Sequence, residues 1–175
     1  MTKHSWSFNG VDMLEKYGLI LEEPFDDKLQ PRLRERKLVV PKRSGAYDYG
    51  AKYYDEREVI VKCASVKLLT RNDVRKLAKE LSVKGELRDW HEPDKYYVGR
   101  MYESPDIERL AGVGKRFQLE FVCEPFAYGR QVTSTFINQI KMSYDGTAST
   151  PVHIVIKNTS GTDIKGLTIL IRETI

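Results

Sequence analysis

The chain has 175 residues, of which 41% are hydrophobic, so it is long enough to bury a core and too apolar to be disordered. Charged residues make up 31% of it, and no apolar run approaches the roughly 20 residues of a membrane-spanning helix, which argues against a membrane protein. The formal net charge of +4 permits contact with a polyanion without demanding it. Met1–Trp6 lacks the apolar segment of a secretory signal, so we expect the chain to be made in the cytoplasm.

The first elements lie within residues 6–23, which we interpret as an opening strand and turn. Trp6–Phe8 alternates in hydropathy, and the dipeptide Asn9-Gly10 is a strong turn signal. Leu19 and Leu21 then supply apolar positions after the turn. This pattern is typical of a sheet that begins near the N-terminus.

A basic stretch follows at residues 32–43, with Pro31 before it and Pro41 near its end, and we expect it to form a projecting arm or hairpin. Residues 44–54 are rich in tyrosine and predict an exposed aromatic loop. Together the two segments contain our candidate subunit interface: Arg32, Arg34, Arg36, Lys37, Arg43, Tyr47, Tyr49, Tyr53 and Tyr54. Because Tyr and Arg are enriched at protein interfaces, we favour a protein contact for this set. Stacking on a single-stranded nucleic acid is the alternative.

The middle of the chain predicts a strand and then a helix. Residues 59–66 are rich in β-branched side chains, as strands are. Thr70 and Asp73 form a near capping box at the start of a helix over 70–81. Val74, Leu77, Ala78 and Leu81 give this helix a single apolar stripe, which should pack on a sheet, while its basic residues should face solvent. We expect Gly85 to stop or turn the chain after the helix.

Three more strands are predicted at residues 86–90, 95–102 and 116–123. The last of them alternates Phe117, Leu119, Phe121 and Cys123. Beyond residue 145 the chain changes: 147–151 reads as a linker of small residues, and 152–156 with 167–171 predict a β-hairpin around 158–162. We therefore divide the chain into residues 1–145 and residues 146–175. The residues predict a mainly β fold, one β-rich domain with one α-helix packed on a sheet, plus the C-terminal β-hairpin.

No catalytic, cofactor or metal site emerges from the sequence. His4, His91 and His153 lack partners at metal-ligand spacing, so we expect no metal. The stretch 112–116 lacks the first glycine and the final Ser or Thr of a phosphate-binding loop, and we interpret it as a loop between antiparallel strands. The two cysteines, Cys63 and Cys123, lie in strand-like runs and should be reduced core residues. We expect a protein that is not an enzyme and binds no cofactor.

Several short motifs follow one another along the chain, beginning with Phe8-Asn9-Gly10, Tyr17-Gly18-Leu19 and the Pro-Lys-Arg-Ser-Gly-Ala of residues 41–46. The first two are similar to the "FNG…YGL" start of the siphophage distal tail proteins, the baseplate hubs of long-tailed phages, and residues 41–46 are similar to the "P-x-R-x-G" stretch of that family. Residues 54–63 resemble the strand that follows, residues 94–100 the "D-x-Y-Y-x-x-R" strand, and residues 117–125 the closing strand. The resemblance covers about residues 6–130.

This resemblance implies a structural protein whose N-terminal domain is a β-sandwich with one packed α-helix, like that of tail-tube proteins. It also implies that the protein forms a hexameric ring at the tail tip. The ring would join the tail tube protein to a tail-associated fibre or lysin protein, with DNA passing through its lumen. Larger family members carry a C-terminal β-sandwich, and residues 146–175 look like its opening. The implied location is the virion tail tip, after assembly in the host cytoplasm. Another tail component, such as a tube or tube-terminator subunit, is the first alternative, and a nucleic-acid-binding module that uses residues 32–43 is the second.

Overall fold

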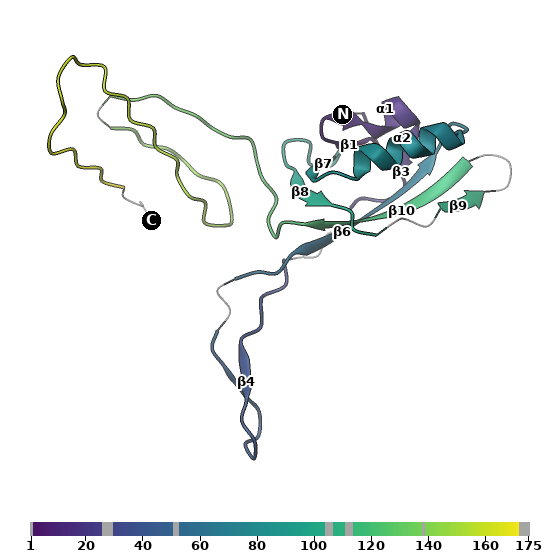
Figure 1. The fold of residues 1–175 in the computed structure, drawn as a ribbon, viewed down its shortest axis with the longest axis horizontal. Helices are drawn as coiled ribbons and strands as arrows, with labels where there is room; N and C mark the ends of the chain where they lie inside the picture. The colour runs from purple at the N-terminus through teal and green to yellow at the C-terminus, as the bar shows by residue number, and fades with distance from the viewer. Residues whose placement is uncertain are drawn as a thin grey trace. The chain divides into compact units, whose positions relative to one another are not determined.

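The computed structural model describes residues 2–25, 30–50, 53–103, 107–110, 114–137 and 139–171. It contains two compact units, Met1–Thr135 and Phe136–Ile175, which follow one another along the chain (Figure 1). The first unit holds all the helices and strands found among the described residues.

The first unit opens with a tight hairpin and a one-turn helix. Strand β1 (Trp6–Phe8) pairs with β2 (Val11–Asp12) through a turn in which Asn9 and Gly10 have φ of 49° and 77°. Two successive positive φ angles are the geometry that favours Asn-Gly. Helix α1 (Met13–Tyr17) starts at Asp12, whose carboxylate accepts hydrogen bonds from two backbone N–H groups, and ends at Gly18 with φ 68°. The expected strand and turn are present, whereas α1 was not predicted.

The remaining strands complete one eight-stranded sheet in the order β2-β1-β7-β8-β10-β6-β3, with β9 also paired to β10. Their bounds are β3 (Leu19–Leu21), β6 (Arg57–Ser65), β7 (Gly85–Asp89), β8 (Tyr97–Arg100), β9 (Ile107–Leu110) and β10 (Gly114–Cys123). The longest ladder joins β6 and β10 antiparallel, from Arg57 opposite Cys123 to Ala64 opposite Arg116. Gly114 and Lys115 are thus strand residues paired with β9, which the sequence had not predicted.

The sheet curls until its two ends meet. Leu21 N, at the end of β3, donates a hydrogen bond to His4 O, just before β1, at 2.9 Å. On the inside, the rings of Phe8 on β1 and Phe121 on β10 lie 5.4 Å apart. The predicted mainly β fold with a packed helix is confirmed. Its strands form one continuous curled sheet rather than two separate layers, because β8 and β10 link the two halves.

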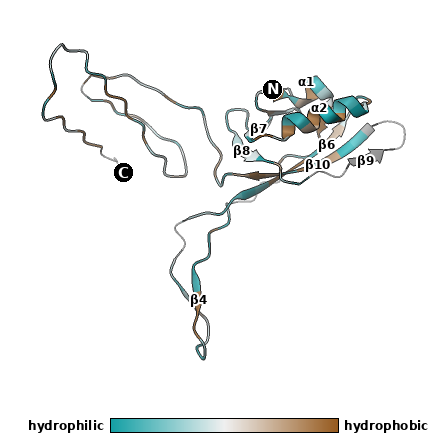
Figure 2. Ribbon diagram, in the orientation of Figure 1, coloured by the Kyte–Doolittle hydropathy of each residue, from teal (hydrophilic) through white to brown (hydrophobic). Residues whose placement is uncertain are grey.

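Helix α2 (Arg71–Leu81) closes the core. Thr70 and Asp73 form the complete capping box, which confirms the predicted start of the helix. Leu77 and Leu81 are buried and Val74 is partly buried against the core, but Ala78 is exposed, so the stripe is narrower than predicted. In Figure 2 the α2 ribbon carries both hydrophobic and hydrophilic segments, as expected of a helix with one packed side.

Gly85 does not stop this helix, contrary to expectation. The helix ends at Ser82, and Gly85 is the first residue of β7. A side chain at position 85 would collide with the Asn9 side chain, so the glycine serves a close approach of β7 to the β1–β2 turn.

The core lies between the curled sheet and the helices. Its fully buried large side chains come from β1, α1, β3, β6, β7 and β10: Trp6, Phe8, Met13, Leu19, Leu21, Val59, Val61, Cys63, Leu87, Phe117, Leu119 and Phe121. The predicted alternation of β10 is confirmed, since Phe117, Leu119, Phe121 and Cys123 are all buried.

The second unit has no strand or helix in its described residues 139–171. The hairpin predicted from 152–156 and 167–171 is therefore not formed, although local hydrogen bonds close the expected turn, with Asn158 Nδ2 donating to Thr162 O at 2.9 Å. Every residue from 151 to 171 is exposed. An isolated two-stranded hairpin is barely stable in water. Among the described residues, nothing covers the apolar side chains of 152–156 and 167–171, so pairing of these segments would gain little.

Candidate assembly surface

Residues 30–50 and 53–55 belong to a long two-stranded excursion between β3 and β6, which we call the arm. Near its tip, β4 (Lys37–Val39) pairs antiparallel with β5 (Ala46–Asp48) (Figure 1). Closer to the sheet, Leu33 lies opposite Tyr54 in a second antiparallel bridge. The hairpin predicted for the basic stretch is confirmed. The aromatic segment was predicted to be a loop, but part of it is strand β5, which pairs with β4. The three residues of β5 are all exposed, so no pattern in the sequence indicated this pairing.

The base of the arm is held by hydrogen bonds and one ion pair. Arg34 N donates to Tyr53 O, and Asp55 N donates to Arg32 O, each at 2.8 Å. The Arg34 guanidinium Nε lies 2.9 Å from Asp55 Oδ1. The Tyr54 ring packs edge-on against Phe126, just after β10, with 5.0 Å between the ring centres. Tyr54 and Arg34 therefore serve to anchor the arm.

The tip presents basic and aromatic residues on a common face. Leu38 is directly opposite Tyr47, and Tyr49 N donates to Arg36 O at 3.0 Å. Since alternate residues of a strand share a face, Arg36, Leu38, Tyr47 and Tyr49 lie on the same side. Arg43 adds a stacked cation, with its guanidinium carbon 3.7 Å from the centre of the Tyr47 ring. We call this side, including Arg43, the aromatic face of the arm.

The aromatic face and its surroundings are exposed to an unusual degree for apolar side chains. Relative exposures are 74% for Val39, 66% for Tyr49, 60% for Tyr53 and 51% for both Leu38 and Tyr47. A ribbon of this kind buries too little of its own surface to be stable in isolation. Contiguous exposed apolar residues on an extended strand pair are typical of a surface that another chain covers.

The structure brings some of the predicted interface residues together and separates others. Arg36, Arg43, Tyr47 and Tyr49 gather on the aromatic face, as described. Lys37 lies on the opposite face, with its Nζ 3.6 Å from Glu35 Oε2. Leu38 and Val39 were not among the predicted interface residues, and the signal that could have found them is the short apolar run Leu38-Val39-Val40 within an otherwise basic stretch.

Outside the arm, the described residues contain no metal-binding cluster, no membrane-spanning helix and no reactive cysteine. Within the described ranges, no group of three or more His, Cys, Asp or Glu side chains could hold a metal ion, and no helix is long and apolar enough to cross a bilayer. Cys63 and Cys123 are free and buried, and burial raises the pKa of each thiol to about 12. Both remain protonated at neutral pH and unreactive as nucleophiles.

Comparison with known proteins places this geometry in context. Residues 13–123 match the family model of the phage tail protein RIFT-related domain. Among solved structures, the chain is similar to the Dit protein of phage SPP1, described as a paradigm of the hub adsorption apparatus in phages that infect Gram-positive bacteria. The TM-score is 0.58 at 21% sequence identity, and the match covers 74% of this chain and 54% of that one. The comparison with curated protein sequences found no match.

These findings agree with the order of elements and with the sequence resemblance. The matched residues start at α1 and end with the last residue of β10, so they contain the arm, α2 and all but the first two strands of the curled sheet. The likeness to the Dit protein supports the same β fold. The chain therefore belongs to the phage tail protein family with the RIFT-related domain, to which its resemblance to siphophage distal tail proteins had pointed.

Proposed function

We propose that this chain is the hub subunit of a siphophage tail tip and that six copies close into a ring. Membership of a structural tail-protein family supports a role in the virion tail. The observation that carries the finer proposal is the arm, whose exposed strands and aromatic face have no cover among the described residues of this subunit. A ring built head to tail needs two different, complementary surfaces on each subunit, and the arm is one of them.

The chemistry of the arm defines its counterpart. Its exposed cations include Arg32, Arg36 and Lys37, and its tip adds Arg43 over Tyr47. Arginine prefers carboxylates because its planar fork can donate two parallel hydrogen bonds. The receiving surface on the next subunit should therefore combine carboxylates with an apolar patch that covers Leu38 and Tyr47.

In this proposal the ring joins the tail tube protein to a tail-associated fibre or lysin protein, and DNA passes through its lumen. Assembly takes place in the host cytoplasm before the virion is complete. A tube or tube-terminator subunit is the alternative within the same class, because such a subunit would share the fold but assemble as a stack or a cap. The oligomeric mass and a negative-stain image of the assembled protein distinguish a six-membered ring from a stack.

Charge reversal tests the role of the arm. Arg32→Glu combined with Arg36→Glu leaves the Arg34–Asp55 ion pair at the base intact. We expect this variant to keep its thermal unfolding midpoint but to lose ring formation under crowded conditions and incorporation into tails. The matched control, Lys3→Glu with Arg75→Glu, makes the same charge change at exposed sites outside the arm and should assemble normally. Unimpaired assembly of the arm variant would remove the arm from the interface.

The aromatic face also fits the alternative from another class, a nucleic-acid-binding module. Tyrosines can stack on bases while arginines neutralise phosphates. Salt separates the two readings, because a phosphate-driven complex weakens steeply as salt rises. We expect ring formation to be retained between 50 mM and 200 mM salt, a range over which phosphate contacts lose affinity by roughly 10³-fold or more when six or more are made.

A further inference from the structure

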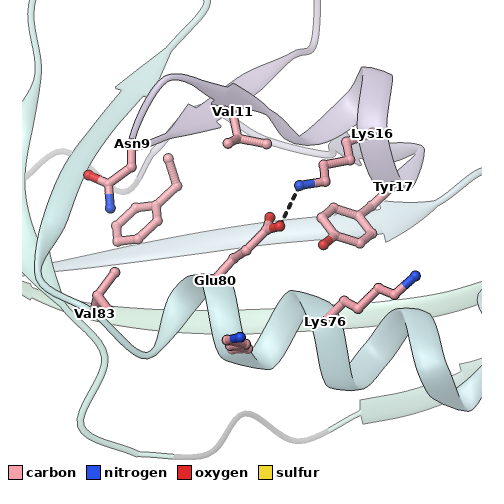
Figure 3. A pocket seen from close by; sticks show the side chains of 9 residues that line it. Asn9, Val11, Lys16, Tyr17, Lys76, Glu80 and Val83 are labelled. Atoms are coloured by element: carbon pink, nitrogen blue, oxygen red, sulfur yellow. Dashed lines mark hydrogen bonds and ion pairs between the residues drawn. The ribbon is translucent and has the colours of Figure 1, made fainter.

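A second surface of the first unit lies away from the arm, between the two helices. A groove of about 480 Å³ runs between α1, the β1–β2 turn and α2 (Figure 3). Apolar side chains line much of it, namely Phe8, Val11, Tyr17 and Val83. One side of α2 contributes residues at helical spacing, namely Lys76, Lys79 and Glu80, and Val83 follows just after the helix. The basic residues of α2 predicted to face open solvent thus include two that border a cavity.

The rim of the groove is positively charged. Lys16 on α1 forms an ion pair with Glu80 on α2, which joins the two helices across the groove (Figure 3). Lys76 and Lys79 form no ion pair within the described part of the chain, although Lys76 acts electrostatically on Asp73, and with Lys16 they outnumber the one carboxylate of the lining, Glu80. A ligand with carboxylates would complement them.

Tyr17 Oη and Glu80 Oε2 are buried side by side at the groove and interact with each other. Tyr17 is only 4% exposed, and its hydroxyl points into the space between the helices (Figure 3). Burial, reinforced by a hydrogen bond to the Glu80 carboxylate, raises the pKa of Tyr17 to about 12, so this hydroxyl stays a hydrogen-bond donor at neutral pH.

We propose that this groove binds an acidic peptide segment of a partner protein, with an apolar or aromatic side chain on the floor and a carboxylate between Lys76 and Lys79. A main-chain carbonyl of the segment would replace the Glu80 carboxylate as the acceptor of a hydrogen bond from the Tyr17 hydroxyl. The arm of a second copy does not fit, because its excess of arginine and lysine would face a basic rim. A nucleic acid matches the lysines but not the apolar floor. The inference is independent of the ring and of the arm.

Two synthetic peptides test it on the full chain. The probe is N-acetylated, amidated Gly-Asp-Phe-Glu-Leu-Gly, and its matched control replaces both acids with lysine. In amide-resolved NMR titrations we expect the acidic peptide to shift the signals of Tyr17, Lys76 and Val83 saturably, and the basic peptide to leave them unchanged. No saturable shift at millimolar peptide, or equal binding of both peptides, would overturn the proposal.

Three variants locate the contact. Lys76→Glu with Lys79→Glu should weaken the acidic peptide at least about tenfold, as expected when charge-assisted hydrogen bonds are lost. Arg71→Glu with Arg75→Glu changes charge on the same helix outside the lining and should not weaken it. Tyr17→Phe keeps the ring and removes the hydroxyl, and a roughly fivefold loss is expected. A ten-residue oligothymidine that binds the groove while the acidic peptide does not would reassign the site and refute the proposal.

Discussion

Single side chains fix where the helices of this tail protein begin and end. Asp12 accepts hydrogen bonds from Leu14 N at 2.9 Å and Glu15 N at 3.1 Å, and Gly18 ends the turn in the left-handed conformation. Thr70 Oγ1 accepts from Asp73 N at 3.2 Å while Asp73 Oδ2 accepts from Thr70 N at 3.0 Å. These contacts satisfy N–H groups that have no partner inside a helix.

Replacing Thr70 with Ala should lower the free energy of unfolding by about 1 kcal/mol, the usual cost of losing a helix cap. The hydrogen bonds from Thr70 hold the pKa of Asp73 below its ordinary value, so this pKa should rise in the variant. Because the folded-state pKa is lowered, the contribution of the charged carboxylate is complete above the unfolded pKa and is lost as pH falls through the folded pKa.

The difference between Thr70→Ala and the parent should accordingly shrink from pH 7 to pH 3. Urea unfolding at both pH values and an NMR titration of Asp73 measure the two effects. Thr133→Ala, at an exposed position, is the control. A pH-independent difference would show that the Asp73 carboxylate does not contribute through the cap.

Gly99 is a position where the absence of a Cβ atom allows two strands to pack closely. It lies on β8, paired with Cys123 and Gly85, and an added Cβ would meet Cys123 Sγ and, at 2.8 Å, the Val122 carbonyl oxygen. Because backbone cannot move aside cheaply, Gly99→Ala should destabilise the protein by about 1–3 kcal/mol. Gly129→Ala, which meets nothing within 4 Å, should be nearly neutral. Chemical denaturation measures the free energy of unfolding of both variants. Equal stabilities would contradict the close approach of β8 to β10 at Gly99.

Among the elements, α2 packs on the core by a single face, with Leu77 and Leu81 buried. Leu77 is 3% exposed, while its neighbour Ala78 is exposed. Leu77→Ala should cost about 2–5 kcal/mol, since it removes buried methyl groups and leaves a cavity. Ala78→Ser should change stability by less than about 0.5 kcal/mol, as surface substitutions do. Similar losses for both, measured by urea unfolding, would mean that α2 packs by another face.

The elements that sequence predicted carry their own local signals. The capping box and the apolar stripe predicted α2, and Asn9-Gly10 predicted the first turn. The alternation of apolar and polar side chains over residues 117–123 predicted β10. Helix α1 was missed because it spans five residues, too few for a periodic stripe, although Asp12 and Gly18 mark its ends. Strand β5 was missed because all three of its residues are exposed, so no face of the strand is buried and the sequence carries no pattern of buried and exposed positions.

The opposite error occurred in the second unit. Residues 152–156 and 167–171 have the composition of strands, yet they form none. Strand propensity reports how well a side chain fits a half-buried pleated surface, so it does not act without a partner to bury it. The interface residues were predicted from composition alone. Their division into anchoring and exposed sets required the pairing of Leu33 with Tyr54, which links residues 21 positions apart.

At the scale of the whole molecule, the two units differ in how they are stabilised. The buried residues among those described all lie in Met1–Thr135. A chain of residues 1–135 should therefore unfold cooperatively with the denaturant dependence of the parent and a free energy changed by less than about 0.5 kcal/mol. Urea unfolding followed by tryptophan fluorescence reports on this directly, since Trp6 and Trp90 both lie in the retained part. A clear loss of stability would reveal a contribution from Phe136–Ile175.

The arm occupies a connection between two strands, β3 and β6, that are already hydrogen-bonded neighbours. Its two ends are thus held together by the sheet whatever lies between them, and the entropic cost of closing such a connection grows only slowly with its length. Changes in the sequence or length of the arm should therefore leave the curled sheet and its folding the same.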